Sequence, residues 1–223
     1  SVQPYGTLCA WLITALNTVT NNLDRAGGAM FPMPPFDPRW LPRAMSVGPG
    51  SYGRWRSRVR GLPEAGGELP VSTMAEEMLT PGEGQLRALV TSAGNPVLST
   101  PNGAQLDRAL AGLELMVSID PYLNETTRHA HLILPPASPL ALGHYDLVFN
   151  ALAVRRVARW SAPVQAMRDD ERADWTILDG IAAAHAAAQG KPWSRLPPPE
   201  VIVREGLKRG GSGLEFDALV AAT

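Results

Sequence analysis

Two short polar motifs, each directly after an apolar run, carry the side chains of this sequence that are best suited to binding a ligand. The first is Gly94-Asn95-Pro96, which follows the run Ala88–Ser92. The second contains Asp120 and Asn124 and follows the run Leu115–Ile119. A glycine lets a ligand approach the main chain closely, and an asparagine side chain both donates and accepts hydrogen bonds.

Asp120 has two alternative roles. A carboxylate at the end of a buried strand can accept from ribose hydroxyls, as in dinucleotide-binding folds, or from the N1–H and exocyclic amino group of guanine. The structural alternative is that Asp120 caps the helix that follows. Asn124, Glu125 and Thr126 leave the same choice open between helix cap and ligand contact, and Gly-Asn-Pro also occurs in ordinary turns.

The segments around the motifs predict the elements that would bring them together. Both apolar runs are short and bounded by glycine, asparagine or proline, which is typical of buried strands. Residues 102–113 between them carry apolar side chains at helical spacing, namely Leu106, Ala109, Leu110 and Leu113. Strand, helix, strand predicts a parallel pair with a right-handed crossover, so both motifs should lie at the carboxyl edge of the sheet, where open α/β sheets bind ligands.

The order of elements predicts an α/β fold, with a three-layer, doubly wound and mostly parallel sheet of the Rossmann-like kind. A third strand is expected at Leu132–Leu134, after a short helix at Glu125–His129 that Asn124 is placed to cap. We expect an N-terminal helix within residues 1–30, an irregular Pro/Gly-rich insertion at 31–71, an α/β dinucleotide-binding core at 72–190, and a linker with short helices at 191–223.

Apolar spacing also predicts the remaining elements. Helices are expected at Thr7–Leu23, stopped by Gly27-Gly28; at Met74–Leu79, capped by Ser72 or Thr73; at Trp175–Ala188, capped by Asp174 and ended by Gly190; and at Val201–Leu207 and Phe216–Val220. The face of the third of these should contain Ile177, Leu178, Ile181, Ala182 and His185. We expect Val154–Trp160 to be extended.

Composition excludes several classes of protein. With 223 residues, a net charge of -1 and no apolar run long enough to span a bilayer, the chain is not expected to bind nucleic acid or a membrane. The single cysteine, Cys9, rules out an internal disulfide and a thiolate cluster, and we expect it to be a buried apolar residue. The four histidines lack convergent spacing, so no metal ligand is predicted.

Four arginines alternate with other residues in the irregular segment: Arg54, Arg56, Arg58 and Arg60. In an extended strand, a period of two places all four on one side. Such a row could contact phosphates, but a solvated basic edge explains it as well.

The motifs together resemble the catalytic subunits of the molybdopterin oxidoreductase family (the dimethyl-sulfoxide-reductase superfamily), in its formate-dehydrogenase-like branch. The residues that carry the resemblance are 22–28, 87–99, 118–130, 132–136 and the helix that begins near Asp174-Trp175. Two positions depart from the family pattern, since His131 and Ala141 stand where the family usually has acidic residues.

The resemblance implies a molybdenum or tungsten enzyme that holds molybdopterin guanine dinucleotide. It implies that one dinucleotide site is lined here by Gly94, Asn95, Pro96, Asp120 and Asn124. The family's iron–sulfur cysteines, metal-ligating residue and C-terminal cofactor domain have no counterpart in this sequence, so it implies no catalytic residue and no metal ligand here.

On this interpretation the chain is a middle fragment of the enzyme, inactive alone, and its partners are the remaining domains of the parent. The first residue is Ser1 rather than Met, as expected of an excised piece. A cytoplasmic location is expected, with an export signal on a missing N-terminus left open. The alternatives are a stand-alone nucleotide-binding module without redox activity and a structural interaction domain.

Overall fold

Two units make up the chain in the computed structural model, which describes residues 3–37 and 52–222. The first unit comprises Ser1–Pro38, His144–Ser161 and Pro199–Thr223. The second comprises Arg39–Gly143 and Ala162–Pro198, and it carries both polar motifs.

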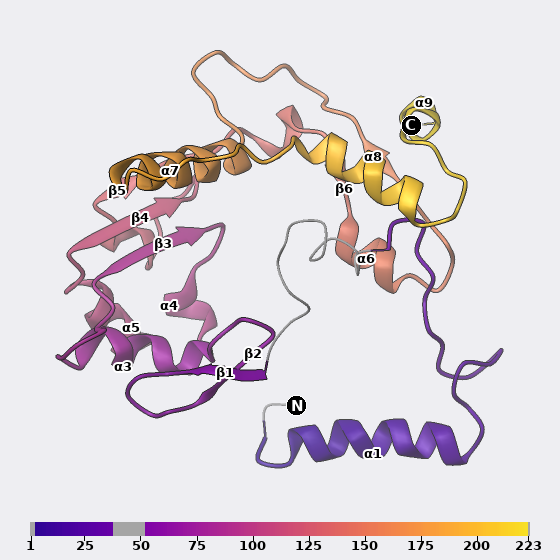
Figure 1. The fold of residues 1–223 in the computed structure, drawn as a ribbon, viewed down its shortest axis with the longest axis horizontal. Coiled ribbons are helices and arrows are strands. Elements are labelled where there is room, and N and C mark those ends of the chain that lie inside the picture. The colour runs from indigo at the N-terminus through magenta and orange to yellow at the C-terminus, as the bar shows by residue number, and fades with distance from the viewer. Residues whose placement is uncertain (1–2, 38–51, 223) are drawn as a thin grey trace. The chain divides into compact units, whose positions relative to one another are not determined.

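A three-stranded parallel sheet lies at the centre of the second unit (Figure 1). β3 (Ala88–Ser92) pairs with β4 (Leu115–Ile119), and β5 (Leu132–Ile133) pairs with the other edge of β4. The parallel arrangement confirms the prediction, although the third strand is one residue shorter than expected. The fold is therefore mixed α/β with a parallel sheet, while the full three-layer, Rossmann-like arrangement stays a prediction.

One face of the sheet is covered by two helices, α3 (Met74–Leu79) and α5 (Gly103–Leu110). Their contact with β4 is a cluster of buried apolar side chains: Met78, Leu106, Ala109, Leu110, Leu113 and Met116. All four residues that the helical spacing placed on the inner face of 102–113 are in this cluster, which confirms that prediction. Burying a large apolar side chain contributes about 1.5–3 kcal/mol, so this cluster is a main source of the unit's stability.

The opposite face of the sheet is only partly covered. Val90, Leu115 and Leu132 point to that face, since they share it with Val117 through the register of the three strands, and each is roughly half exposed. Parallel sheets are normally covered by helices on both faces. The second face therefore keeps apolar surface that the described residues do not cover.

An antiparallel hairpin occupies part of the segment that was predicted to be irregular. β1 (Tyr52–Arg56) pairs with β2 (Pro63–Ala65), so the prediction is wrong for these residues, while 38–51 lie outside the described residues. The hairpin is attached to α3, because Arg58 pairs with the buried Glu77 at 3.3 Å and Arg60 pairs with Glu76 at 2.5 Å. These ion pairs mean that the four arginines do not form one free row.

The helix α3 has the predicted bounds, but the Thr73 side chain does not cap it, and two later helices begin before their predicted starts. The 3-10 helix η2 (Val71–Thr73) continues directly into α3, and the Thr73 hydroxyl donates to the carbonyl of Pro70 instead of capping α3. In α7 (Asp174–Ala188) the N-cap is Ala173 and Asp174 is already helical. α8 (Pro199–Arg209) starts two residues early, since proline suits the first helical position.

The buried face of α7 also differs from the prediction. Its buried residues are Asp179 and Ala186, whereas Leu178 is exposed. Alanines occur on all sides of this helix, so the spacing of apolar residues does not identify one buried face. Asp179 is buried because it accepts from Trp193 Nε1 at 3.0 Å and pairs with Arg195 at 3.0 Å, which holds the segment that follows the helix. Gly190, with φ +66, ends the helix as predicted.

Aromatic packing forms the core of the first unit. Trp160 of β7 (Trp160–Ser161) meets Phe216 of α9 (Phe216–Ala221) edge to face at 5.0 Å. Tyr145 of β6 (His144–Tyr145) packs near Phe36. α9 confirms the helix predicted at Phe216–Val220.

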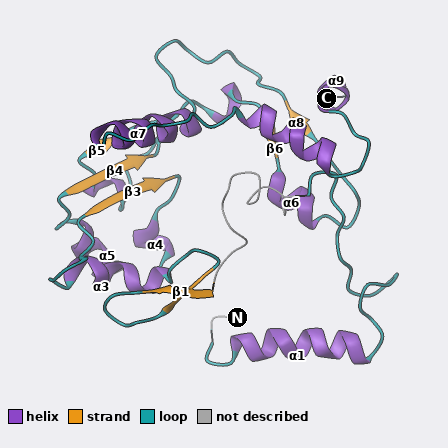
Figure 2. Ribbon diagram, in the orientation of Figure 1, coloured by secondary structure: helices purple, strands orange, loops and turns teal. Residues whose placement is uncertain are grey.

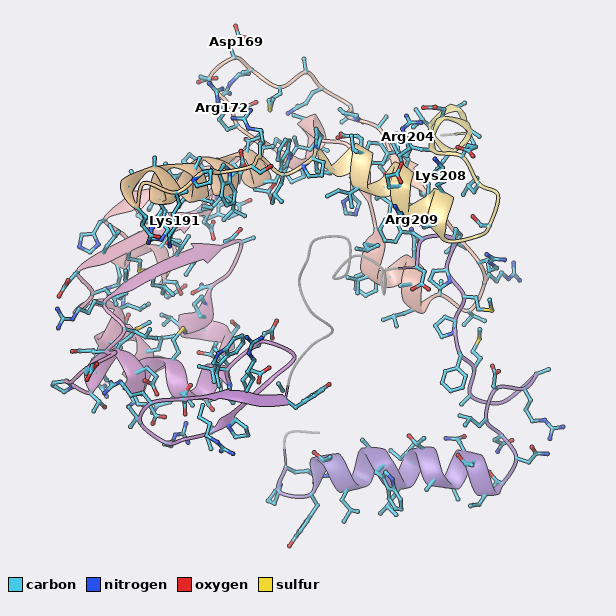
Figure 3. The ribbon with its side chains drawn as sticks, in the orientation of Figure 1. Asp169, Arg172, Lys191, Arg204, Lys208 and Arg209 are labelled. Atoms are coloured by element: carbon cyan, nitrogen blue, oxygen red, sulfur yellow. The ribbon has the colours of Figure 1, made fainter. Side chains whose placement is uncertain are left out.

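Charged residues line α8, from which Arg204, Lys208 and Arg209 extend (Figure 3). Arg204 joins α8 to α9 through two hydrogen bonds to Asp217, at 2.6 and 2.7 Å. Planar guanidinium and carboxylate groups match in this two-pronged geometry.

Three predictions about the first unit are wrong. Cys9, which was expected to be buried, is exposed. Most of 154–160 is coil rather than strand, and the preceding residues form α6 (Leu147–Leu152), whose N-terminus is capped by the Asp146 carboxylate accepting from Phe149 N at 2.8 Å. α1 (Gly6–Val19) ends before the predicted Leu23, since Asn21 adopts a left-handed conformation with φ +57. Figure 2 shows both helices and the coil that follows α6.

The contact between α5 and the short helix α4 (Pro96–Ser99) depends on Gly103. A Cβ at this position would lie 2.0 Å from the carbonyl oxygen of Val97, so we expect Gly103→Ala to destabilise the protein by about 1–3 kcal/mol. Urea unfolding followed by circular dichroism measures this loss.

Gly180→Ala in α7 is the matched control. Nothing lies within 4 Å of its added Cβ, so alanine there should stabilise the protein by about 0.5–1 kcal/mol. Equal unfolding midpoints for the two variants would contradict the close contact of α4 with α5.

Candidate functional site

The two polar motifs meet at the carboxyl edge of the sheet, as the strand order requires. The amide of Ala93 donates to the carbonyl of Ile119 at 3.0 Å, which extends the β3–β4 ladder one residue beyond the strands. Ala93 then turns the chain with φ +50, a conformation that non-glycine residues seldom adopt. Such strain persists only where surrounding contacts fix the backbone, and here they do.

The Asn95 side chain joins the two motifs across 30 residues of sequence. Its Nδ2 donates to Glu125 Oε2 at 2.7 Å, and its Oδ1 accepts from the hydroxyl of Thr126 at 2.7 Å. The same hydroxyl accepts from the backbone amide of Val97 at 3.1 Å. Thr126 is fully buried, so the two bonds of its hydroxyl are shielded from water, whereas the bond from Asn95 to Glu125 is exposed; together they fix one loop against the other. We call these contacts the loop tie.

Asp120 and Asn124 shape the second motif from within. Asp120 Oδ1 accepts from the amide of Tyr122 at 2.8 Å, and Oδ2 lies 3.4 Å from Asn124 Nδ2. Asn124 Oδ1 accepts from the amides of Thr126 and Thr127, both at 2.9 Å. The helix predicted at Glu125–His129 is the shorter 3-10 helix η3 (Thr127–His129), whose N-cap position is Thr126. Asn124 still bonds the amides at its start, as expected of a capping side chain, whereas the described contacts of the Asp120 carboxylate are with Tyr122 and Asn124.

Some of these groups keep capacity for a ligand. Asp120 is 7% exposed, and its carboxylate has lone pairs beyond the two contacts it makes. A Cβ at Gly94 would meet no atom closer than 3.8 Å, and Gly94 lacks a left-handed φ, so neither packing nor backbone conformation requires glycine there. The exposed side chains of Tyr122 and Leu123 lie next in sequence to this edge.

Negative charge dominates the loop tie. The hydrogen bond from Asn95, followed by the backbone amide of Glu125 itself, lowers the pKa of the Glu125 carboxyl below its ordinary value. Glu125 is therefore a carboxylate at neutral pH. With Asp120 close by in the sequence, the second motif presents acceptors rather than the donors that a phosphate needs.

A second cluster, which the sequence did not reveal, holds η3 against α5. Asp107 Oδ1 accepts from Arg128 Nη2 and His129 Nε2, each at 2.6 Å. The hydrogen bond from Arg128, then that from His129, lowers the pKa of Asp107. His131 has a structural contact too, since its Nδ1 accepts from the amide of Met116 at 3.0 Å.

The described part of the chain contains neither a metal-binding cluster nor a membrane-spanning helix. Within 3–37 and 52–222, no three His, Cys, Asp or Glu side chains converge so as to hold a metal ion. No helix in the same ranges combines the length and apolar character needed to cross a membrane.

The sequence predicted which residues meet at this sheet edge but not the contacts between them. Gly94, Asn95, Pro96, Asp120 and Asn124 all lie in the two loops that meet at this edge. Thr126 was expected to cap a helix or to contact a ligand, and Thr127 was assigned no role, yet both are fully buried and bond within the loops. Two adjacent threonines within a loop otherwise suited to solvent were the available signal.

Comparison with known proteins gives distant relatives that are oxidoreductases. The chain is 30% identical over 161 residues to the assimilatory nitrate reductase catalytic subunit of Bacillus subtilis (strain 168), covering 68% of this chain and 21% of that protein. It is 30% identical over 138 residues to a nitrate reductase of Symbiobacterium thermophilum, covering 61% of this chain and 17% of that protein.

A third relative has another activity. The chain is 31% identical over 98 residues to the NADPH-Fe(3+) oxidoreductase subunit alpha of Geobacter sulfurreducens (strain DL-1 / KN400), covering 43% of this chain and 11% of that protein. No protein-family model matches the chain. The chain thus spans about a fifth or less of the length of these relatives.

The loop tie makes a prediction about Thr126. Thr126→Val keeps the shape but removes the hydroxyl, leaving Asn95 Oδ1 and the amide of Val97 without this partner, so we expect a loss of about 1–3 kcal/mol in the free energy of unfolding. Thr126→Ser keeps the hydroxyl and loses one buried methyl, which costs about 1 kcal/mol. Urea denaturation compares the two variants; valine tolerated as well as serine would mean that the tie contributes nothing.

The Asp107 cluster makes a prediction about pH. A pKa lowered in the folded state means that the ionised Asp107 stabilises the fold above its unfolded pKa of about 3.9, and that this contribution is lost as the pH falls through the lower, folded value. Stability measured from pH 7 to pH 3 should therefore fall more steeply for the natural chain than for Asp107→Asn. Parallel curves would remove Asp107 from the acid response.

Proposed function

We propose that this chain is part of a molybdopterin-dependent oxidoreductase, and that its two loops hold one guanine dinucleotide arm of the cofactor. The observation that carries the proposal is the meeting of both motifs at one sheet edge, with a nearly buried carboxylate, Asp120, that keeps acceptor capacity. The oxidoreductase relatives support the redox part of the proposal.

The hydrogen-bond acceptors of the two loops fit the nucleoside end of such a cofactor better than its phosphates. Asp120 offers two carboxylate oxygens to paired donors such as N1–H and the amino group of guanine, or to ribose hydroxyls. Glu125 stays charged beside Asn95 and would repel a phosphate. The main chain at Gly94 is free of a side chain, so a flat base or sugar can approach it closely.

The five expected site residues would then have separate roles. Asp120 and the backbone of Gly94 would contact the nucleoside. Asn95 and Asn124 position the loops, since their amides are already bonded to Glu125, Thr126 and Thr127. Pro96 begins α4, where its fixed φ and missing N–H suit the first helical turn.

No residue of this chain is proposed to be catalytic. In the whole enzyme the pterin-bound molybdenum or tungsten supplies the redox chemistry, and an iron–sulfur cluster would be held by other parts of the protein. The chain's own contribution is to bind and orient. The narrower, formate-dehydrogenase-like assignment stays a prediction from the sequence, because the relatives carry nitrate reductase and NADPH-Fe(3+) oxidoreductase names.

The proposal is tested by Asp120→Asn in the longer polypeptide that naturally carries this sequence. The amide keeps an oxygen for the amide of Tyr122 but turns the second acceptor into a donor facing a donor of guanine, a loss on the order of 2–4 kcal/mol. We expect partial depletion of pterin and metal, measured by fluorescence of the released pterin and by elemental analysis. The melting temperature should fall only slightly, since among the described residues the substitution removes only the 3.4 Å contact with Asn124 Nδ2.

Gly94→Ala is the second variant, with Gly112→Ala as its matched control. Both added Cβ atoms meet only ordinary contacts, at 3.8 Å and 3.6 Å, so neither should change folding. Only the alanine at 94 should reduce cofactor content, because it alone occupies the path of a ligand to the loop. Full pterin content in both Asp120→Asn and Gly94→Ala would overturn the proposed site.

A further inference from the structure

α1 is an uncharged helix whose apolar side chains lie open. Its sequence from Gly6 to Val19 contains no Asp, Glu, Lys or Arg. Six large apolar side chains are between 50% and 79% exposed: Leu8, Trp11, Leu12, Ile13, Leu16 and Val19. A helix on a protein surface normally carries charged or polar residues on the side that faces water.

The apolar residues cover too wide an arc for a single neighbour. At 100° per residue they extend from Trp11 to Ile13 over about 200° of the helix circumference. The stripe that an ordinary amphipathic helix buries against one layer is roughly 100° wide. α1 therefore has apolar surface for contacts on two sides.

The polar side chains of α1 need little from water either. The hydroxyls of Thr14 and Thr18 donate to the carbonyls of Ala10 and Thr14, and Asn17 Nδ2 donates to the carbonyl of Ile13 at 2.9 Å. Each bond runs back to the residue four positions earlier, so these polar groups are satisfied by the helix itself. Three polar side chains of α1 thus find a partner within the helix, which lowers the cost of burying it.

A membrane and a second copy of this helix would each cover the apolar surface of α1 poorly. At 14 residues, α1 is about 21 Å long, which is shorter than the roughly 30 Å apolar layer of a membrane, and it lacks the lysines and arginines of helices that lie on membrane surfaces. A second copy of α1 would cover one stripe and leave the rest of the arc in water.

We infer that α1 is an interior helix, covered on two sides by apolar segments of a longer polypeptide to which this sequence belongs. The relatives support this occupant, since about four fifths or more of each lies outside the matched length. The inference does not depend on which cofactor the sheet edge binds, because α1 contributes no residue to that site.

Cys9 provides the test, because it is the only cysteine of the chain and lies on α1 within the apolar arc. In the purified 223-residue chain, its thiol should react with Ellman's reagent within about threefold of the rate for the same chain unfolded in guanidinium, as an exposed thiol does. In the longer natural polypeptide, mass spectrometry of the Cys9 peptide after timed maleimide labelling should show protection of at least about tenfold, since a covered thiol reacts only when the structure opens.

Three outcomes would overturn the inference. Cys9 labelled equally fast in the longer polypeptide would mean that α1 stays uncovered. Protection in the 223-residue chain itself means self-contact if it is independent of concentration, and a second copy if it grows with concentration and a dimer appears by light scattering. Protection that appears only with phosphatidylcholine vesicles would assign the helix to a membrane surface.

A pair of charge variants separates burial from an effect of charge on the helix. Leu12→Lys lies in the centre of the apolar arc, and Asn17→Lys adds the same charge about 140° away. Leu12→Lys should leave the melting temperature of the 223-residue chain unchanged, since Leu12 is exposed there, but should lower the soluble yield of the longer polypeptide several-fold. Equal effects of both lysines in the longer polypeptide would contradict an apolar cover over Leu12.

Discussion

The hydrogen bond between Asn95 and Thr126 is the contact on which the candidate site depends. Parallel strands bring the ends of β3 and β4 to one edge, but they do not fix the loops beyond those ends. The loop tie does so through two side chains that each make two hydrogen bonds. The Asn95 amide bonds Thr126 and Glu125, and the Thr126 hydroxyl bonds Asn95 and the amide of Val97. Because Thr126 is fully buried, breaking the tie would leave polar groups unpaired in a dry environment, and the loops therefore move as one piece.

This arrangement separates holding the loops from binding a ligand. The asparagines use their amides within the protein, whereas the carboxylate of Asp120 and the bare main chain at Gly94 remain available. A loop that is already rigid loses little conformational entropy when a ligand binds. The strained backbone of Ala93 is likewise fixed before any ligand binds, by its hydrogen bond to the carbonyl of Ile119.

The sequence was sufficient where a local pattern and burial agree. The parallel strands were predicted from short apolar runs, and the inner face of α5 was predicted from apolar residues at helical spacing. Both predictions hold because these residues are buried in one cluster. It was insufficient where long-range contacts decide the structure. The ion pairs of Arg58 and Arg60 with two glutamates of α3 hold the hairpin β1–β2 against that helix, and no local sequence pattern predicts such pairs. The position of Asn124 predicted its bonds to the amides of the next turn, but the contact of Asn95 with Thr126 forms only through the fold.

Cys9 shows most clearly why a pattern alone misled. Its apolar neighbours predicted burial, and the structure instead leaves Cys9 and the large apolar side chains of α1 exposed. The open face of the sheet behaves in the same way, since Val90, Leu115 and Leu132 form an apolar row that the described residues do not cover. Leaving such surface in water is unfavourable by about 25 cal/mol for each Å² that could be buried. Two separate elements with this excess, one in each unit, are explained together if the pattern was selected in a larger protein whose other segments cover both.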